Sequence, residues 1–314
     1  MKTVAYDSKY TDAVVALWNQ TLVVDPMTKQ RFLQNVTLDD NFSPELCRVA
    51  LDGDRVIGFI WAVSRKVPYG ERGLEPTRGW IVLLFVDQAY QRQGVGTQLV
   101  QEVEAIFATQ KKQLITLAAY SPNYLFPGVD NEHYAGAIDF FTQLGYTKGP
   151  QAVSMHRELF NFKFPEAYPQ FKAELEAEGF RLSNFKLDDA EELIDFLKVN
   201  FGGGWARNVK QALLSGRGED TLLVVKDKNA EIVGYCQRAI DGNPDRFGPF
   251  GVKESLRGKH IGVLLFNEML FDMLKKEIHN VYFLWTGGSA QRFYAKNGME
   301  VYRDYTVMKK EVKD

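Results

Sequence analysis

The sequence predicts a mixed α/β fold made of two similar domains in tandem. The chain has 314 residues, which is long enough for two hydrophobic cores of ordinary size. Short apolar runs typical of strands alternate with stretches of helical periodicity. These elements come in the same order in each half of the chain, as in an internal repeat.

The amino-acid composition narrows the classes of molecule that we expect the protein to bind. The 38 basic and 40 acidic residues give a net charge of -2, so no overall field recruits nucleic acid or an anionic membrane. No stretch approaches the roughly 20 apolar residues of a membrane span, and the N-terminus has no signal core. Cys47 and Cys236 lie in strand-like runs without metal-ligand spacing. We therefore expect a cytoplasmic protein without a metal, with small molecules or other proteins as partners.

The first half begins with a strand at residues 3–6 and a helix that starts near Thr11. A hairpin follows over residues 46–61. An apolar strand at residues 80–86 then runs into a glycine-containing turn at 87–96 and a long amphipathic helix. The half closes with a strand, a short helix and a last strand, at residues 113–119, 135–145 and 152–156.

The second half repeats this order. A hairpin is expected over residues 221–235, and an apolar strand at 250–252 leads through a turn at 253–262 into another long helix. The closing strand, helix and strand are expected at residues 281–285, 290–298 and 302–308. The repeat predicts one domain at 1–160, a packed helical connector rich in Phe at 161–176, and a second domain at 177–314.

The turn of the first half, Gln91-Arg92-Gln93-Gly94-Val95-Gly96-Thr97, has the chemistry of a phosphate site. A strand, a glycine turn and a helix N-terminus direct several free backbone N–H groups and the positive end of the helix dipole at one spot. The Walker spacing and the Rossmann fingerprint are both missing. The alternative is that the glycines only form a turn and bind no ligand. This alternative does not explain why the same strand, turn and helix recur in the other half.

At these residues the sequence resembles the GNAT N-acetyltransferases, whose signature Gln/Arg-x-x-Gly-x-Gly/Ala is matched by Gln91-x-x-Gly94-x-Gly96. The order of elements resembles that family twice, as in tandem members such as mycothiol synthase. The resemblance implies that acetyl-CoA is the co-substrate. It implies that the pyrophosphate is held by Arg92, Gln93, Gly94, Val95, Gly96 and Thr97. It also implies that the pantetheine arm lies along the splayed strand Leu84-Phe85-Val86.

The second half departs from the signature. The stretch that corresponds reads Arg257-Gly258-Lys259-His260-Ile261-Gly262 after a strand that ends at Val252. His260 stands where the first motif glycine is expected. Its ring either points away or blocks the phosphates, while Arg257 and Lys259 keep cationic donors nearby. By resemblance Val252, Arg257 and Gly262 are the candidate cofactor contacts of this half.

Transfer of an acetyl group to an amine requires donors for the oxyanion and a proton for the departing thiolate. In the family a tyrosine on the helix near residue 290 often supplies that proton, and Tyr294 occupies this place. The first half has Phe141 there, which has no proton to donate. Three interpretations stay open. The first domain uses another acid such as Tyr124 or water, the second is active despite His260, or one domain only supports the other.

The loop at residues 120–133 is an insertion near the expected thioester and is a candidate for the acceptor site. Asp130 and Glu132 are candidates to hold a cationic amine, and His133 is a candidate to relay its proton. We expect direct acetyl transfer to the amine of a small molecule by a monomer, a pseudo-dimer of two domains, or by a homodimer. The alternatives are an acyltransferase acting on a peptide or protein amine, and a non-catalytic acyl-CoA-binding regulator.

Overall fold

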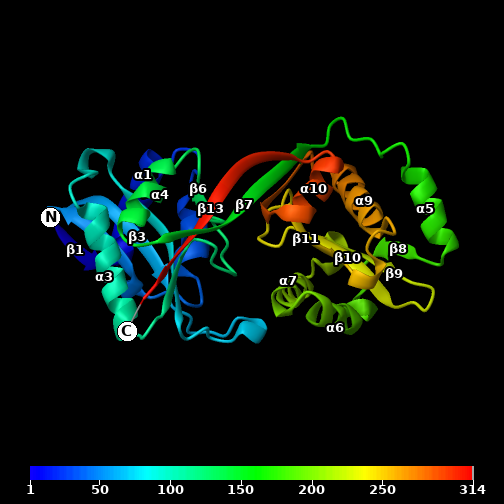
Figure 1. Ribbon diagram of the computed structural model, residues 1–314, viewed down its shortest axis with the longest axis horizontal. Helices are drawn as coiled ribbons and strands as arrows, with labels where there is room; N and C mark the ends of the chain where they lie inside the picture. Colours follow the sequence, from blue (N-terminus) through cyan, green and yellow to red (C-terminus); the bar gives the residue numbers. More distant parts are fainter. Residues whose placement is uncertain (313–314) are drawn as a thin grey trace. The chain divides into compact units, whose positions relative to one another are not determined.

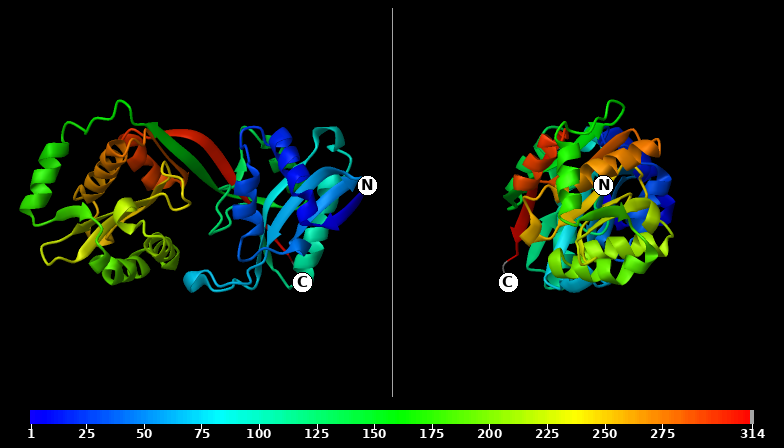
Figure 2. Two further views of the ribbon diagram at one scale, coloured as in Figure 1. Left: turned by 180° about the vertical axis from the view of Figure 1, so that it is seen from behind. Right: turned by 90° about the vertical axis from the view of Figure 1, so that its right-hand side faces the viewer.

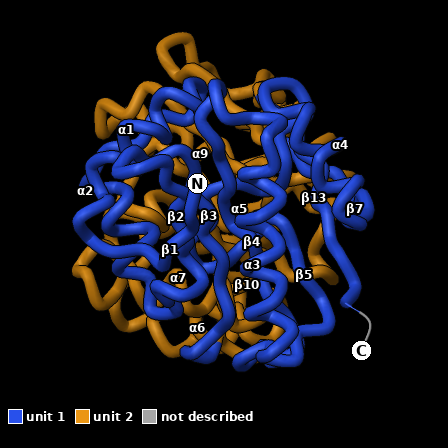
Figure 3. Tube along the Cα trace, turned by 90° about the vertical axis from the view of Figure 1, so that its left-hand side faces the viewer, with its two compact units in different colours: residues 1–68, 72–153, 303–314 blue, residues 69–71, 154–302 orange. Residues whose placement is uncertain are grey.

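The structure is a computed structural model that describes residues 1–312, and it divides into two compact units (Figure 3). Unit 1 contains residues 1–68, 72–153 and the C-terminal segment from Arg303, and unit 2 contains residues 69–71 and 154–302. Residues 303–312, which were expected in the second domain, therefore belong to unit 1. The reason is a long last strand that pairs with strands of the first half rather than only with its own neighbours.

Unit 1 is built on one mixed sheet (Figure 1). Its strand order is β1-β2-β3-β4-β5-β13-β7, with the short β6 also paired to β13. The strands are β1 Lys2–Ala5, β2 Cys47–Asp52, β3 Arg55–Val63, β4 Arg78–Val86, β5 Leu114–Leu117, β6 Val129–Asp130, β7 Thr147–Glu158 and β13 Glu300–Glu311. Neighbours from β1 to β4 are antiparallel, and β4 and β5 are parallel. Strands β7 and β13 continue from unit 1 into unit 2.

Helices cover both faces of this sheet (Figure 2). The helices of unit 1 are α1 Thr11–Thr21, α2 Lys29–Phe32, α3 Val95–Thr109 and α4 Ala135–Gln143. Single irregular turns lie at Ser8–Tyr10, Leu33–Thr37, Pro44–Leu46 and Gln88–Tyr90. Alternate strand residues point to opposite faces, so β3 sends Phe59 and Trp61 toward α1 and α2, and Ile60 toward α3 and α4.

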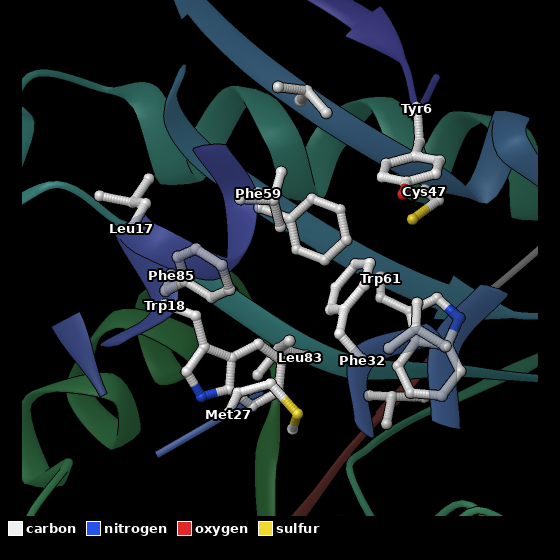
Figure 4. Packing of buried hydrophobic residues seen from close by; sticks show 14 of the residues in the cluster. Tyr6, Leu17, Trp18, Met27, Phe32, Cys47, Phe59, Trp61, Leu83 and Phe85 are labelled. Carbon is white, nitrogen blue, oxygen red and sulfur yellow. The ribbon is translucent and has the colours of Figure 1, made fainter. Parts of the chain in front are cut away.

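An aromatic core fixes α1 on the sheet (Figure 4). Trp18 is fully buried, and its ring meets Phe85 of β4 at 5.7 Å edge to face. Its indole N–H donates to the backbone oxygen of Asp25 at 2.7 Å. Phe32 packs against Phe59 at 5.9 Å in the same cluster. The start of the chain is thereby held against the middle of the sheet.

Unit 2 has a separate four-stranded sheet of order β11-β10-β9-β8. The strands are β8 Arg181–Asn184, β9 Leu222–Lys226, β10 Ile232–Arg238, β11 Phe247–Val252 and, paired with β7, β12 Asn280–Thr286. The helices are α5 Tyr168–Ala177, α6 Ala190–Asn200, α7 Gly203–Leu214, α8 Gly218–Thr221, α9 Ile261–Lys275 and α10 Gly288–Lys296. Short 3₁₀ turns lie at Leu187–Asp189 and Glu254–Leu256, and another at Gly70–Arg72 spans a unit boundary.

The mixed α/β class predicted from the sequence is confirmed, with a hairpin, a strand, a glycine turn and a long helix in each half. No helix in residues 1–312 is both long and apolar enough to cross a membrane.

Replacing Trp18 by Ala tests the core of unit 1. We expect Trp18→Ala to lower the free energy of unfolding by about 3–5 kcal/mol, because a large buried ring is lost and a cavity remains. Leu38→Ala is the control, since Leu38 is exposed, and it should change the value by less than about 0.5 kcal/mol. Urea denaturation followed by circular dichroism measures both. Equal losses in the two variants would contradict this packing.

Candidate functional site

Strand β4 separates from β5 halfway along its length. The parallel register of the two strands runs from Arg78 to Ile81, where Ile81 lies beside Leu117, and no strand of the described chain pairs with β4 on this side beyond Ile81. The backbone N–H of Asp87 donates to Ile57 of β3 at 2.9 Å. Because backbone groups alternate along an antiparallel strand, the N–H groups of Val86 and Leu84 point away from β3, into the opening.

The turn after β4 brings a second set of backbone donors to the same opening. Gly94 is the N-cap of α3 with φ of 85°, and no side chain caps the helix. The first intrahelical bond runs from Gln98 to the Gly94 carbonyl, so the N–H groups of Val95, Gly96 and Thr97 are left without helical partners. A left-handed Arg92, with φ of 61°, precedes this turn and curls the backbone into a concave nest.

These two sets of donors line one cleft of about 790 Å³, a size within the range of small-molecule sites. The lining residues come from the end of α1 and its following loop, from β4, from the glycine turn, from the loops before and after β6, and from α4. They include Thr21, Leu22, Val23, Val24, Leu84, Phe85, Val86, Gln91, Arg92, Gly94, Gly96, Thr97, Phe126, His133, Tyr134, Phe140 and Phe141.

The residues of the turn fit a diphosphate. A Cβ on Gly94 would meet no atom within 4 Å, so the space above its backbone is open. A Cβ on Gly96 would lie 3.3 Å from the ring of Phe140, which shows that α4 packs against the base of the loop. Arg92 lines the cleft and is exposed, with a guanidinium that forms no ion pair with the described residues. Phe85 lies between Leu84 and Val86 on β4, but its backbone N–H and carbonyl face β3 and its ring is buried in the core.

Unit 2 has the same loop backbone with different side chains. Gly258 and His260 take φ values of 86° and 64°, matching the left-handed positions of Arg92 and Gly94. The His260 ring stacks on Phe171 of α5 with centroids 3.8 Å apart and planes within 5°. Lys259 pairs with Glu178 at 2.6 Å, and Arg257 pairs with Glu254 at 3.2 Å. The cations of this loop are thus engaged with carboxylates of unit 2.

Aromatic rings pack beside β11 in unit 2. Strands β11 and β12 lie in different ladders, and a single bridge joins Arg246, just before β11, to Tyr282 of β12. The ring of Phe250 stacks on Phe293 at 5.6 Å, and its tip lies 3.3 Å from where a Cβ on Gly262 would stand. Phe250 thus packs beside the loop of unit 2. Val252 is buried at the end of the same strand.

Tyr294 belongs to that aromatic cluster. It is 9% exposed and packs against Phe283 with centroids 4.5 Å apart, and also against Phe247 and Phe266. Burial raises the pKa of its hydroxyl well above the usual value. Its counterpart Phe141 is buried on α4 and borders the cleft of unit 1. Tyr124 is half-buried in the loop before β6 and is not among the residues that line the cleft.

The other predicted acceptor residues take different places. Asp130 is 2% exposed and accepts hydrogen bonds from Arg303 and His133, so its carboxylate is enclosed. Burial alone would raise the pKa of Asp130, but the backbone bond from His133 and the Arg303 guanidinium outweigh burial and lower it. His133 lines the cleft, whereas Glu132 is exposed and is not among the lining residues.

Sequence reasoning missed three residues beside His133. Asp25 follows α1, Tyr134 precedes α4, and Arg303 comes from β13. Tyr134 donates to Asp25 at 2.7 Å, and Arg303 contacts both Asp25 and Asp130. No local signal marks Arg303, because it lies 173 positions from Asp130 in the chain and reaches it only through strand pairing. Within residues 1–312 no cluster of three or more His, Cys, Asp or Glu is arranged to hold a metal ion.

Comparison with known proteins gives a family for the first half. Residues 14–146 match the model of the acetyltransferase (GNAT) family. No curated protein matches the sequence.

Three solved structures share the fold along almost the whole chain. The glucosamine N-acetyltransferase region of a fungal multi-domain GH3 beta-N-acetylglucosaminidase superposes with a TM-score of 0.80 at 21% identity, over 98% of this chain and 38% of that protein's chain. This protein therefore spans well under half the length of that relative. A GCN5-related N-acetyltransferase from Sphaerobacter thermophilus gives a TM-score of 0.74 at 16% identity, over 100% of this chain and 96% of that one.

The third is a tandem GNAT protein from the clavulanic acid biosynthesis pathway, with a TM-score of 0.65 at 15% identity over 100% and 99% of the two chains. At these identities the structural likeness establishes the fold. Residues 14–146 therefore match the acetyltransferase (GNAT) family, and along its whole length the chain shares its fold with a tandem GNAT protein.

Proposed function

We propose that unit 1 binds acetyl-CoA and transfers its acetyl group directly to the amine of a small molecule. The observation that carries the proposal is one cleft that joins the unpaired edge of β4 to the uncapped N-terminus of α3. Backbone donors at two ends of a cleft suit a long ligand with a diphosphate at one end and amide groups along its arm.

In this proposal the N–H groups of Val95, Gly96 and Thr97 hold the pyrophosphate, and Arg92 adds a cation at the rim. The N–H groups of Leu84 and Val86 bond to the amides of the pantetheine arm in the manner of an added strand. Gln93 is kept as a rim residue, although its side chain donates to Ala89 at 2.8 Å. An unpaired backbone N–H of β4 stabilises the oxyanion as the amine attacks the thioester.

The second unit supports the first in this proposal and does not bind the donor. In its loop the His260 ring stacks on Phe171, and Phe250 packs on Phe293 beside Gly262. In this proposal these aromatic neighbours take the place of a bound diphosphate. Val252, Arg257 and Gly262 keep only the backbone of a cofactor site.

Other features support a small-molecule acceptor. The cleft is lined by the apolar side chains of Leu22, Val23 and Phe126 and by the polar side chains of His133 and Tyr134. The similar fungal region is described as a glucosamine N-acetyltransferase, which is a small-molecule activity. We also propose a cytoplasmic location, since Cys47 and Cys236 are unpaired and buried. The rival function is a non-catalytic acyl-CoA-binding regulator, which is favoured by the absence of a tyrosine at position 141.

A charge reversal in the glycine turn tests donor binding. We expect Gly94→Glu to weaken the binding of coenzyme A at least 100-fold, because a carboxylate would face the diphosphate from a left-handed position. Isothermal titration calorimetry measures the affinity. Gly94→Asn is the matched control, since Asn tolerates this backbone without adding charge, and its affinity should stay within about tenfold. Unchanged affinity in Gly94→Glu would move the donor site away from unit 1.

Release of the coenzyme A thiol from acetyl-CoA tests catalysis. We expect the release to depend on an added amine in a panel of glucosamine, 2-phenylethylamine, spermidine and a short peptide, because the amine must attack the thioester. Tyr294→Phe should leave kcat within about twofold, since Tyr294 packs in unit 2. A thiol-reactive dye follows the reaction. Binding of acetyl-CoA without release for any amine would favour the regulator, and a large loss of kcat in Tyr294→Phe would place the chemistry in unit 2.

A further inference from the structure

A connected group of charged and polar side chains lies at one end of the cleft of unit 1. His133 and Tyr134 line the cleft, and Asp25, Asp130 and Arg303 stand behind them. Tyr134 donates to Asp25 at 2.7 Å. Arg303 donates to Asp25 from its two terminal nitrogens at 2.5 and 2.9 Å, and to Asp130 from Nε at 2.6 Å. One guanidinium thus joins two carboxylates that come from distant parts of the chain.

Asp130 fixes the orientation of the His133 ring. Its oxygens lie 3.1 and 3.2 Å from Nδ1 of His133, and it also accepts the backbone N–H groups of Glu132 and His133. An ionised carboxylate only accepts hydrogen bonds, so Nδ1 must carry the proton. The neutral ring therefore has its lone pair on Nε2. The His133 side chain is 32% exposed and lines the cleft.

The charged side chains beside His133 carry a net negative charge. Asp25 and Asp130 contribute two negative charges, and Arg303 contributes one positive charge. A cationic group is therefore attracted to this part of the cleft. Tyr134 cannot compete as the base, because burial and its bond to Asp25 raise the pKa of its hydroxyl far above the usual value.

We infer that His133 is the general base of the acetyl transfer, with Asp130 and Arg303 as its positioning residues, and that the acceptor enters the cleft as a primary ammonium ion. This inference rests on the proposed function. A net negative cluster with an oriented imidazole attracts an ammonium group and also removes the proton that blocks its attack.

The proposed reaction conserves protons and electron pairs. Nε2 of His133 takes one proton from the ammonium group, and the freed lone pair forms a bond to the acetyl carbon while the carbonyl pair moves onto oxygen. The pair on the oxygen then re-forms the carbonyl bond, the C–S bond breaks, and the electrons of that bond leave with the coenzyme A thiolate. The acceptor nitrogen gives its second proton to the thiolate. The products are the N-acetylated amine, the coenzyme A thiol and a protonated His133, which then releases its proton to water.

The C-terminal strand completes this arrangement. Tyr305 of β13 lies opposite Asp130 of β6, and Asp304 accepts the N–H of Asn131 at 3.1 Å. Arg303 is next to this pairing, and its side chain is only 11% exposed. The site of unit 1 therefore depends on a strand that is distant from Asp130 in the sequence.

His133→Gln tests the inference in the full chain with acetyl-CoA and the amine of the panel that is turned over fastest. We expect kcat/KM for the amine to fall about 100-fold or more at pH 7, with affinity for coenzyme A unchanged by calorimetry. The remaining activity should rise with pH until the amine loses its own proton in solution, because the variant lacks a base. His156→Gln, at an exposed histidine of unit 2, is the control and should keep the profile of the unchanged protein.

Arg303→Lys and Arg303→Gln test the positioning role. We expect Gln to lower kcat, and Lys to restore part of kcat by keeping the charge beside Asp25 and Asp130. An equal loss of kcat in both variants would assign Arg303 to folding alone. Turnover that does not change in His133→Gln would overturn the inference and leave the proposed function intact. Binding of coenzyme A without turnover of any amine would overturn both.

Discussion

The proposed site of unit 1 depends on backbone N–H groups that have no hydrogen-bond partner within the strands and helices. Strand β4 keeps its bonds to β3 but loses β5 after Ile81, and α3 begins without a capping side chain. Buried backbone N–H groups without partners cost free energy, so such groups occur where water or a ligand can reach them. The cleft of about 790 Å³ gives that access. The proposed binding of the donor, the orientation of its thioester and the position of the acceptor all follow from this separation of two strands.

Unit 2 shows how side chains change the use of the same backbone. Its loop has left-handed residues at the same two positions, but His260 stacks on Phe171, and Phe250 packs beside Gly262. Aromatic packing of this kind stabilises a unit and needs no ligand. The repeated fold therefore does not imply a repeated activity, and the two loops differ in the aromatic rings that pack beside them.

The sequence predicts the local parts of this account well. The hairpin of β2 and β3, the strand that ends at Val86 and the uncapped helix start at Gly94 each have a signal in a short stretch of residues. The positive φ at Gly94 agrees with the choice of glycine. Features that depend on distant pairing have no such signal. Arg303 joins unit 1 because β13 pairs with β5 and β6, and Asp130 is enclosed for the same reason. The aromatic surroundings of Tyr294 likewise come from β11, β12 and α9 together, so its position on a helix did not reveal its burial.

Electron density for coenzyme A in a crystal of the full chain would show where the donor binds. We predict a diphosphate at the N-terminus of α3, within hydrogen-bond distance of the N–H groups of Val95 to Thr97, and a pantetheine arm beside Leu84 and Val86. Density at the N-terminus of α9 in unit 2, with Phe250 and His260 displaced and the cleft of unit 1 empty, would contradict it.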